Sequence, residues 1–134
     1  MEIIAPEQNF ITAEDDTEIS VHQSFLTAAS VLYDAVYVPS GSNSVATLAA
    51  DPDAIHFLNE AYKHCKAIAA HDDARQVLQA TYFEKKLSPA HSPDLTTENG
   101  IVIGDDLEDL SKQFIKAVAM HRFWDREKKR KVPA

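Results

Sequence analysis

The chain contains 134 residues, 45% of them hydrophobic, which suffices for one compact domain with a single core and is too short for two ordinary domains. Aspartate and glutamate number 21 against 13 lysines and arginines, and the net charge of −8 makes nucleic acid and anionic membranes unsuitable partners. With three glycines and only short apolar runs, we expect neither a glycine-rich nucleotide site nor a membrane span or signal peptide.

The first part of the chain predicts two strands of a parallel sheet with a β-hairpin between them. Residues 3–5 (Ile-Ile-Ala) and 35–38 (Ala-Val-Tyr-Val) are short apolar runs, which are typical of strands buried on both faces. Residues 10–12 and 19–21 flank the polar segment 13–18, whose acidic and threonine residues suit a turn between antiparallel strands. We therefore predict a hairpin insertion.

The rest of the chain alternates helices with two more apolar runs. Asp51 and Pro52 suit the N-cap and first position of a helix that continues at helical spacing to Tyr62. Strands are predicted at residues 67–70 and 101–103, with a helix at 76–82 and a proline-containing loop at 88–93 between them. Asp106 and Asp109 indicate a capped start for a long final helix. Its apolar face is formed by Leu107, Leu110, Phe114, Ala117, Val118, His121 and Trp124.

These elements together predict an α/β fold. We expect a three-layer sandwich with a mostly parallel sheet, helices on both faces and the hairpin insertion. Residues 1–134 then form a single domain.

Longer motifs resemble a known family. Residues 33–41 (Tyr-Asp-Ala-Val-Tyr-Val-Pro-Ser-Gly) lead into residues 44–48 (Ser-Val-Ala-Thr-Leu), and residues 51–70 begin Asp-Pro-Asp-Ala-Ile-His-Phe. With residues 11–15 and 100–104, they resemble the C-terminal domain of large-subunit haem catalases over nearly the whole chain. The resemblance implies a flavodoxin-like fold related to class I glutamine amidotransferases and DJ-1/PfpI proteins.

Two departures from this family affect the expected function. The family domain opens with a strand and a helix before the segment that begins here at Met1, so the domain looks N-terminally shortened. A missing interior strand leaves unpaired backbone groups, which a partner chain could fill. We also expect no catalase body before the domain, and neither an Arg-x-x-x-Tyr proximal pattern nor a distal histidine context occurs in these residues. We therefore expect no haem or other cofactor, and a second copy or a catalase body as the partner.

The resemblance also points to a degenerate catalytic turn. Amidotransferase-like and DJ-1-like relatives place a nucleophilic cysteine at the sharp turn after the strand at residues 67–70, where this sequence has His71, Asp72 and Asp73. Because aspartate cannot replace a thiolate, we expect no catalytic residue here. The carboxylates are expected to cap the following helix, and an acid/base role is the alternative.

A second candidate loop stands where relatives bind an oxyanion through backbone amides, and a small ligand could bind there. It comprises Ser40, Gly41, Ser42 and Asn43. Turn and N-cap duty explains the same residues, and we favour that interpretation.

The remaining candidate groups favour structural roles. Cys65 cannot form an intrachain disulfide, which fits a reducing cytoplasm, and we expect a structural thiol rather than a reactive one. His56 and His64 would lie about 12 Å apart along one helix, too far to share a metal ion, and we expect no metal site. The basic segment 126–131 is expected to be a solvated helix end, with docking to an acidic surface as the alternative.

We therefore predict a non-catalytic accessory and assembly domain, related through its family to hydrogen peroxide detoxification and oxidative stress. The first alternative is a DJ-1-like chaperone or stress-response module that binds exposed apolar segments of other proteins. The second is a residual amidotransferase or hydrolase activity, which we rank last because the thiol is missing.

Overall fold

The computed structural model describes residues 1–7, 9–13, 15–87, 96–98, 100–120 and 122–123. The strands are β1 (Ile4–Ala5), β2 (Asn9–Thr12), β3 (Glu18–Val21), β4 (Gln23–Ser24), β5 (Ala35–Val38), β6 (Ala67–His71), β7 (Thr96–Glu98) and β8 (Ile101–Gly104). The α-helices are α1 (Ser42–Ala50), α2 (Pro52–Lys63), α3 (Arg75–Gln79) and α4 (Leu107–Ala119). Short 3-10 turns are η1 (Ser30–Leu32), η2 (Asp72–Ala74) and η3 (Glu84–Lys86).

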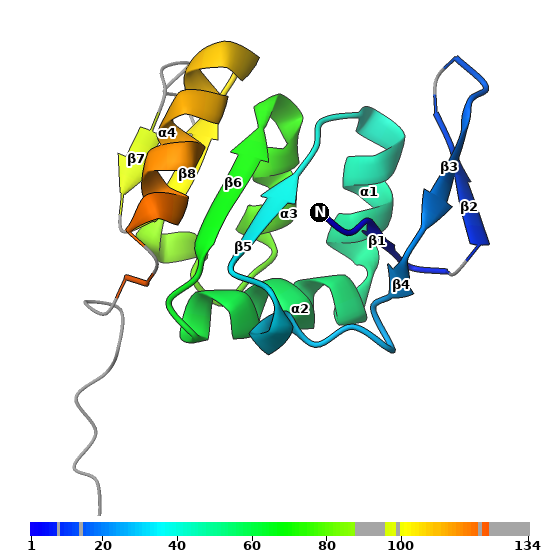
Figure 1. Cartoon of the computed structure of the whole chain (residues 1–134), viewed down its shortest axis with the longest axis horizontal. Coiled ribbons are helices and arrows are strands. Elements are labelled where there is room, and N and C mark those ends of the chain that lie inside the picture. Colours follow the sequence, from blue (N-terminus) through cyan, green and yellow to red (C-terminus); the bar gives the residue numbers. More distant parts are fainter. Residues whose placement is uncertain (8, 14, 88–95, 99, 121, 124–134) are drawn as a thin grey trace, which may run out of the picture.

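The main sheet has the strand order β5-β6-β8-β7 (Figure 1). The first three strands are parallel, with Ala35 opposite Ala67 and Ile68 opposite Ile101, and β7 pairs antiparallel with β8 at the edge. Three of the four apolar runs therefore form parallel neighbours, as predicted. In the central strand β6, the four residues from 67 to 70 are fully buried, because both faces of this part of the sheet are covered.

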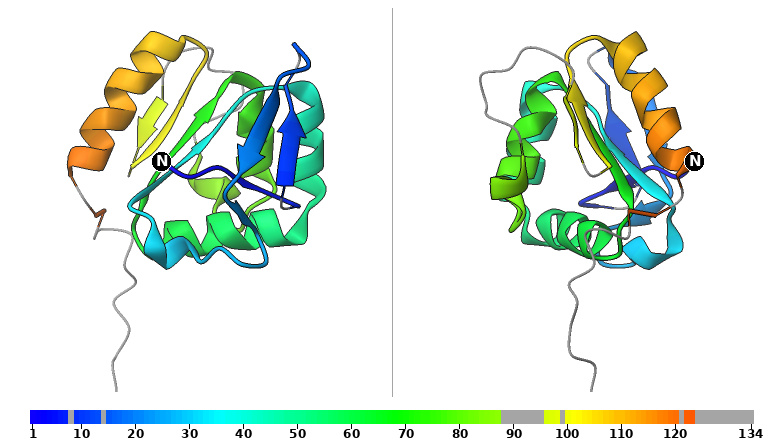
Figure 2. Two further views of the ribbon diagram at one scale, coloured as in Figure 1. Left: turned by 45° about the vertical axis from the view of Figure 1, so that its right-hand side comes forward. Right: turned by 90° about the vertical axis from the view of Figure 1, so that its left-hand side faces the viewer.

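Helices cover both faces of the sheet, which confirms the three-layer α/β sandwich (Figure 2). Helix α4 lies on one face, where Leu110 and Ala117 pack against Ala67, Ala69 and Val102. Helices α1, α2 and α3 lie on the other face and form the larger core. That core includes Val38, Val45, Leu58, Tyr62, Ile68, Val77, Leu78, Phe83, Ile101 and Ile103.

Two helices begin at the carboxylates that the sequence predicts. Asp51 accepts hydrogen bonds from the amides of Asp53 and Ala54 and is followed by Pro52 at the first helical position. Asp106 accepts from the amides of Glu108 and Asp109 at the start of α4. In each case a side-chain oxygen satisfies amide groups that have no partner within the helix.

The hairpin is also confirmed, whereas the first predicted strand has a different place. Strands β2 and β3 pair antiparallel, with Phe10 opposite Ser20. The run at residues 3–5 does not join the main sheet. Its residues Ile4 and Ala5 pair in parallel with β4 in a separate two-stranded sheet. An apolar run fixes that a segment is buried and extended, but not which strand it pairs with.

The helices differ from the prediction at three points. Helix α4 ends at Ala119 and residues 122–123 are not helical, so the helix is shorter than predicted, and Leu107 and Val118 are exposed. The predicted helix at 76–82 is the short α3, which begins at Arg75 and ends at Gln79. Helix α1 was not predicted, because its small residues give a weak apolar periodicity. His121, Trp124, the predicted loop at 88–93 and the basic segment 126–131 lie outside the described residues.

Candidate functional site

The two candidate loops of the sequence meet at one edge of the sheet. Ser40 follows β5, His71 ends β6 and Asp105 follows β8. Because β5, β6 and β8 are parallel, their carboxyl ends lie at the same edge, the usual place of binding sites in open α/β sheets. The structure thus brings residues that are 31 and 34 positions apart in sequence into hydrogen-bond contact.

His71 links the three loops through both ring nitrogens. Its Nδ1 lies 3.0 Å from Ser40 Oγ, and its Nε2 lies 2.9 Å from the backbone carbonyl oxygen of Asp105. A carbonyl oxygen can only accept a hydrogen bond, so Nε2 must carry a proton. In the neutral ring, Nδ1 is then the acceptor, and the Ser40 hydroxyl donates to it.

The turn after β6 keeps the backbone of an elbow without the thiol. Asp72 has a φ of 52°, a left-handed conformation that is uncommon for residues other than glycine. Its side chain is exposed and makes no hydrogen bond among the described residues. The backbone turns sharply at this position, and the side chain there is a carboxylate.

Asp73 connects the elbow to the loop after β5. One of its carboxylate oxygens accepts a hydrogen bond of 3.0 Å from the amide of Gly41. Gly41 has a φ of 135°, which favours glycine, and it is the N-cap of α1. The helix that follows the elbow receives no side-chain cap, so the prediction that these carboxylates cap it is wrong. The reason is that Asp73 reaches across the sheet edge instead.

Ser42 and Asn43 do not join this cluster. They form the first turn of α1 and are exposed, and the backbone carbonyl of Asn43 accepts a hydrogen bond from the Thr47 hydroxyl. Of the four loop residues, Ser40 and Gly41 therefore face the elbow, whereas the other two face solvent at the start of the helix. Gly41 is the N-cap of α1, and no side chain of the loop caps the helix.

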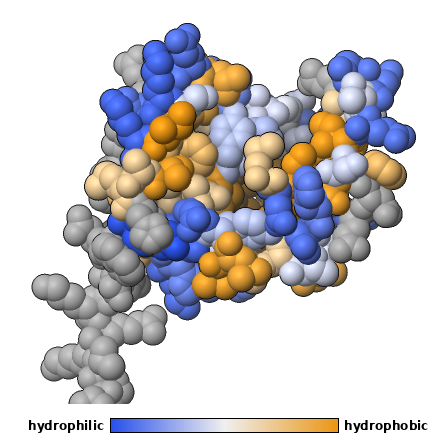
Figure 3. Space-filling model, in the orientation of Figure 1, coloured by the Kyte–Doolittle hydropathy of each residue, from blue (hydrophilic) through white to orange (hydrophobic). Residues whose placement is uncertain are grey.

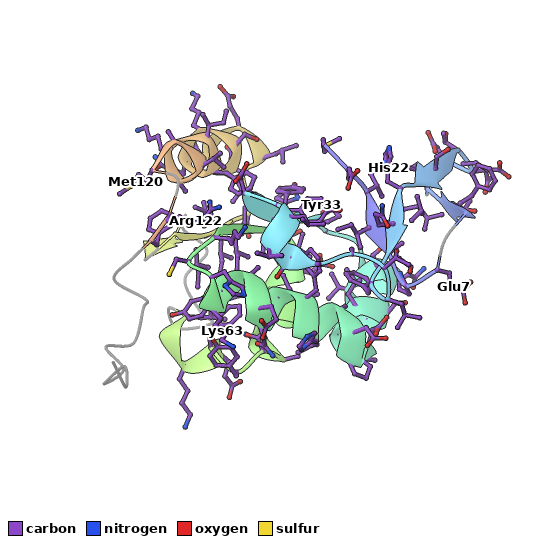
Figure 4. All side chains as sticks on the ribbon, turned by 60° about the horizontal axis from the view of Figure 1, so that its bottom comes forward. Glu7, His22, Tyr33, Lys63, Met120 and Arg122 are labelled. Carbon is purple, nitrogen blue, oxygen red and sulfur yellow. The ribbon has the colours of Figure 1, made fainter. Side chains whose placement is uncertain are left out.

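Cys65 lies at the opposite end of the sheet. It follows α2, precedes β6 and is buried, with a left-handed φ of 63°. Its carbonyl accepts a hydrogen bond from the amide of Phe123, after α4. Met120 and Arg122 are seen where the chain leaves α4 (Figure 4), and Arg122 contacts the carboxylate of Asp34 at 3.4 Å. The thiol is thus enclosed in a structural junction, remote from the elbow.

Sequence reasoning missed a shallow cavity of about 260 Å³ beside α2. It is lined by Phe25, Ala28, Ala29, Ser30, Val31, Asp53, His56, Phe57, Glu60 and His64. The side chains of His64 and Glu60 approach to 3.4 Å. Among the described residues, no group of three or more His, Cys, Asp or Glu side chains is placed to hold a metal ion.

A second polar network holds the segment before β5. The Lys66 ammonium is buried and donates to the carbonyl oxygens of Val31 and Tyr33, and burial, followed by the nearby Arg122, lowers the pKa of Lys66. Burial, followed by its hydrogen bond to Glu2, raises the pKa of Tyr33 to about 12. This network fixes the chain at the amino end of the sheet.

Comparison with known proteins identifies related sequences over most of the chain. Residues 1–128 match the model of the C-terminal domain found in long catalases. The chain is 40% identical to catalase HPII of Mycobacterium avium over 114 residues, which is 81% of the chain and 16% of that protein. It is 37% identical to catalase-2 of Bacillus subtilis over 130 residues, which is 94% of the chain and 17% of that protein. The chain thus spans about a sixth of the length of these curated relatives.

Solved structures show the same fold at low sequence identity. A two-domain protein from Anabaena variabilis with DJ-1/ThiJ/PfpI-like and ferritin-like domains superposes with a TM-score of 0.73 at 14% identity, covering 99% of this chain and 43% of that one. Oxidized DJ-1 of Toxoplasma gondii superposes with a TM-score of 0.69 at 13% identity, covering 93% and 77%. These similarities support the flavodoxin-like fold and do not by themselves assign an activity.

Proposed function

The chain belongs to the family of C-terminal domains found in long catalases, and on this basis we propose that it is an accessory and assembly domain. Its role is to contribute contacts between subunits, or between itself and a catalase body, in the context of hydrogen peroxide detoxification. It takes no part in the peroxide chemistry itself. Its place of action is the cytoplasm, in keeping with a single, buried cysteine that cannot form an intrachain disulfide.

The observation that carries the assembly role is the outer edge of β5. Among the described residues, β5 pairs with β6 alone. Its sequence Ala-Val-Tyr-Val carries no charge or proline within the strand, although natural edge strands are usually protected by such residues. Unpaired backbone groups on an uncharged edge can accept an added strand from another chain, a common mode of protein association.

The side chain beside this edge supports the same interpretation. Tyr37 is 41% exposed, and its ring lies 6.1 Å from that of Phe114 on α4. An added strand would cover this aromatic pair and extend the apolar layer under α4. Burial of an aromatic pair adds to the stability that the backbone hydrogen bonds provide.

The elbow supports an accessory role rather than a thiol hydrolase. The residue in the left-handed position is Asp72, and the only cysteine is buried at the other end of the sheet. The amide of Gly41, which could donate to an oxyanion, already donates to Asp73. Amidotransferase-type chemistry therefore lacks its nucleophile, and one of its backbone donors is occupied.

Sedimentation measurements test the assembly role. We expect self-association of the purified chain, or co-sedimentation with a catalase body lacking this domain. Tyr37→Lys should weaken that association at least about tenfold, because it places a charge at the edge that must be desolvated. Leu107→Lys is the matched control, since Leu107 is 53% exposed at the start of α4, away from β5. A monomeric wild-type chain that also fails to bind the catalase body would refute the proposal.

Absorption and activity measurements test the proposal that the domain takes no part in the peroxide chemistry. We expect no Soret band and no peroxide consumption above buffer. Haem-dependent dismutation by the purified chain would overturn the accessory role.

A DJ-1-like chaperone role is the second candidate, and several exposed apolar side chains favour it. Leu26, Leu32 and Phe10 are 80%, 77% and 62% exposed, and apolar residues are visible over the hairpin in Figure 3. Exposed apolar side chains can hold unfolded segments of other proteins. A light-scattering assay with an aggregating client separates the two roles: failure to suppress aggregation at a stoichiometric ratio counts against the chaperone.

A further inference from the structure

The contact between Ser40 and His71 has the geometry of an activated serine. The hydroxyl oxygen lies 3.0 Å from Nδ1, within the range of a nucleophile and its general base. The Asp105 carbonyl, 2.9 Å from Nε2, fixes the ring in the tautomer that leaves the Nδ1 lone pair free to take the serine proton. Nucleophile, base and orienting group thus follow one another in a single line of hydrogen bonds.

The position of the pair also suits a reaction with a small molecule. Ser40 and His71 are both partly exposed, so a reagent can reach the hydroxyl from solvent. Ser40 precedes Gly41, which has no side chain to shield it on that side, and an added Cβ there would meet only Ser44 atoms at 3.7 and 3.9 Å. Among the serines that the structure describes, no other hydroxyl lies against a histidine ring: the Ser111 hydroxyl, for example, donates to the backbone carbonyl of Leu107 at 2.7 Å.

We infer that Ser40 is an acylation site, activated by His71, which takes the acyl group of small activated carboxylic esters. Ser40 Oγ attacks the carbonyl carbon of the ester while its proton moves to His71 Nδ1. The bond between that carbon and the leaving oxygen then breaks, and the proton on Nδ1 passes to the leaving oxygen. The products are an acyl-serine and an alcohol, and no oxidant or metal ion takes part.

This site lies outside the accessory role proposed above and does not depend on it. It uses the carboxyl end of the sheet, whereas assembly uses the outer edge of β5. Failure of one proposal therefore leaves the other standing.

Incubation of the full chain with p-nitrophenyl acetate, followed by peptide mass mapping, tests the inference. We expect release of nitrophenolate with one acetyl group on Ser40, and loss of that modification in Ser40→Ala. His71→Gln should acetylate Ser40 about a hundredfold more slowly, as expected when a general base is removed. Glutamine can still donate to the Asp105 carbonyl, so this variant removes the base and preserves the orienting contact.

Ser111 provides the internal reference in the same sample. Acetylation of Ser40 no faster than that of Ser111 overturns the inference, and so does an unchanged rate in His71→Gln. Acetylation of lysines without acetylation of Ser40 also overturns the inference. Circular dichroism of each variant checks that the fold is retained, and the comparison of Ser40 with Ser111 within the wild-type chain decides the question even if His71→Gln fails to fold.

Discussion

Substitutions at Asp72 test whether the left-handed backbone conformation of the elbow is strained. Its φ of 52° places an L-residue in the left-handed region, which costs about 1–2 kcal/mol, somewhat less for aspartate than for other side chains. Glycine removes this cost, but it lowers the free energy of unfolding by about 0.5–1 kcal/mol because the unfolded chain gains conformational freedom. Asp72→Gly should therefore leave the free energy of unfolding unchanged or raise it by about 0.5 kcal/mol. The carboxylate has no hydrogen bond among the described residues to lose.

A β-branched residue at the same position should have the opposite effect. Valine resists the left-handed conformation, so Asp72→Val should lower the free energy of unfolding by about 1–2 kcal/mol or more. Urea unfolding of the two variants, monitored by far-ultraviolet circular dichroism, measures the difference, which should be about 2 kcal/mol. Valine that is as well tolerated as glycine would mean that the elbow is not strained.

Asp105→Gly is the matched control for this comparison. Asp105 follows β8 at the same edge of the sheet, is exposed, and does not have a positive φ. Glycine at this position only increases the conformational entropy of the unfolded chain, so the variant should be less stable than the wild type by about 0.5–1 kcal/mol. Destabilisation of similar size by Asp72→Gly would contradict the reasoning, because it would show that the Asp72 side chain contributes a contact that outweighs the relief of strain.

Two further predictions concern a helix cap and a tyrosine. Asp51→Ala removes the acceptor of two amide groups of α2 and should cost about 1 kcal/mol, or about 3 °C in Tm by thermal denaturation; an unchanged Tm would mean that water caps the helix equally well. Because the pKa of Tyr33 is raised from 10.0 to about 12 in the folded chain, its contribution to stability is complete below pH 10.0 and is lost as the pH rises toward about 12. Glu2→Gln should move the phenolate titration of Tyr33, followed by ultraviolet absorbance, back toward 10.0, and a midpoint unaffected by this change would leave burial as the whole cause.

Local signals in the sequence determined most of the secondary structure. Carboxylates at residues 51 and 106 fixed two helix starts, because capping needs only the next few amide groups. Apolar runs marked β5, β6 and β8. Strands β6 and β8 are buried and have no polar side, whereas β5 at the edge of the sheet is only partly buried. The alternation of these strands with helices gave the three-layer sandwich. Part of the site could also be predicted from the sequence, because Ser40 and Asp105 each follow a strand of the parallel sheet and therefore lie at the edge where His71 ends β6.

Pairings between distant segments were decided only by the tertiary structure. The run that contains Ile4 and Ala5 is apolar like the other strands, yet it pairs with Gln23 and Ser24. Backbone N–H and C=O groups are the same in nearly all residues, so they do not determine which strands pair. Helix α4 ends at Ala119, where the chain turns back so that the Phe123 amide reaches the Cys65 carbonyl, a contact that no local pattern encodes. In the same way, Asp73 could have capped its own helix but bonds to Gly41 across the sheet edge. The sequence determined which groups can bond, and the packing of the strands determined which of them lie within 3 Å of each other.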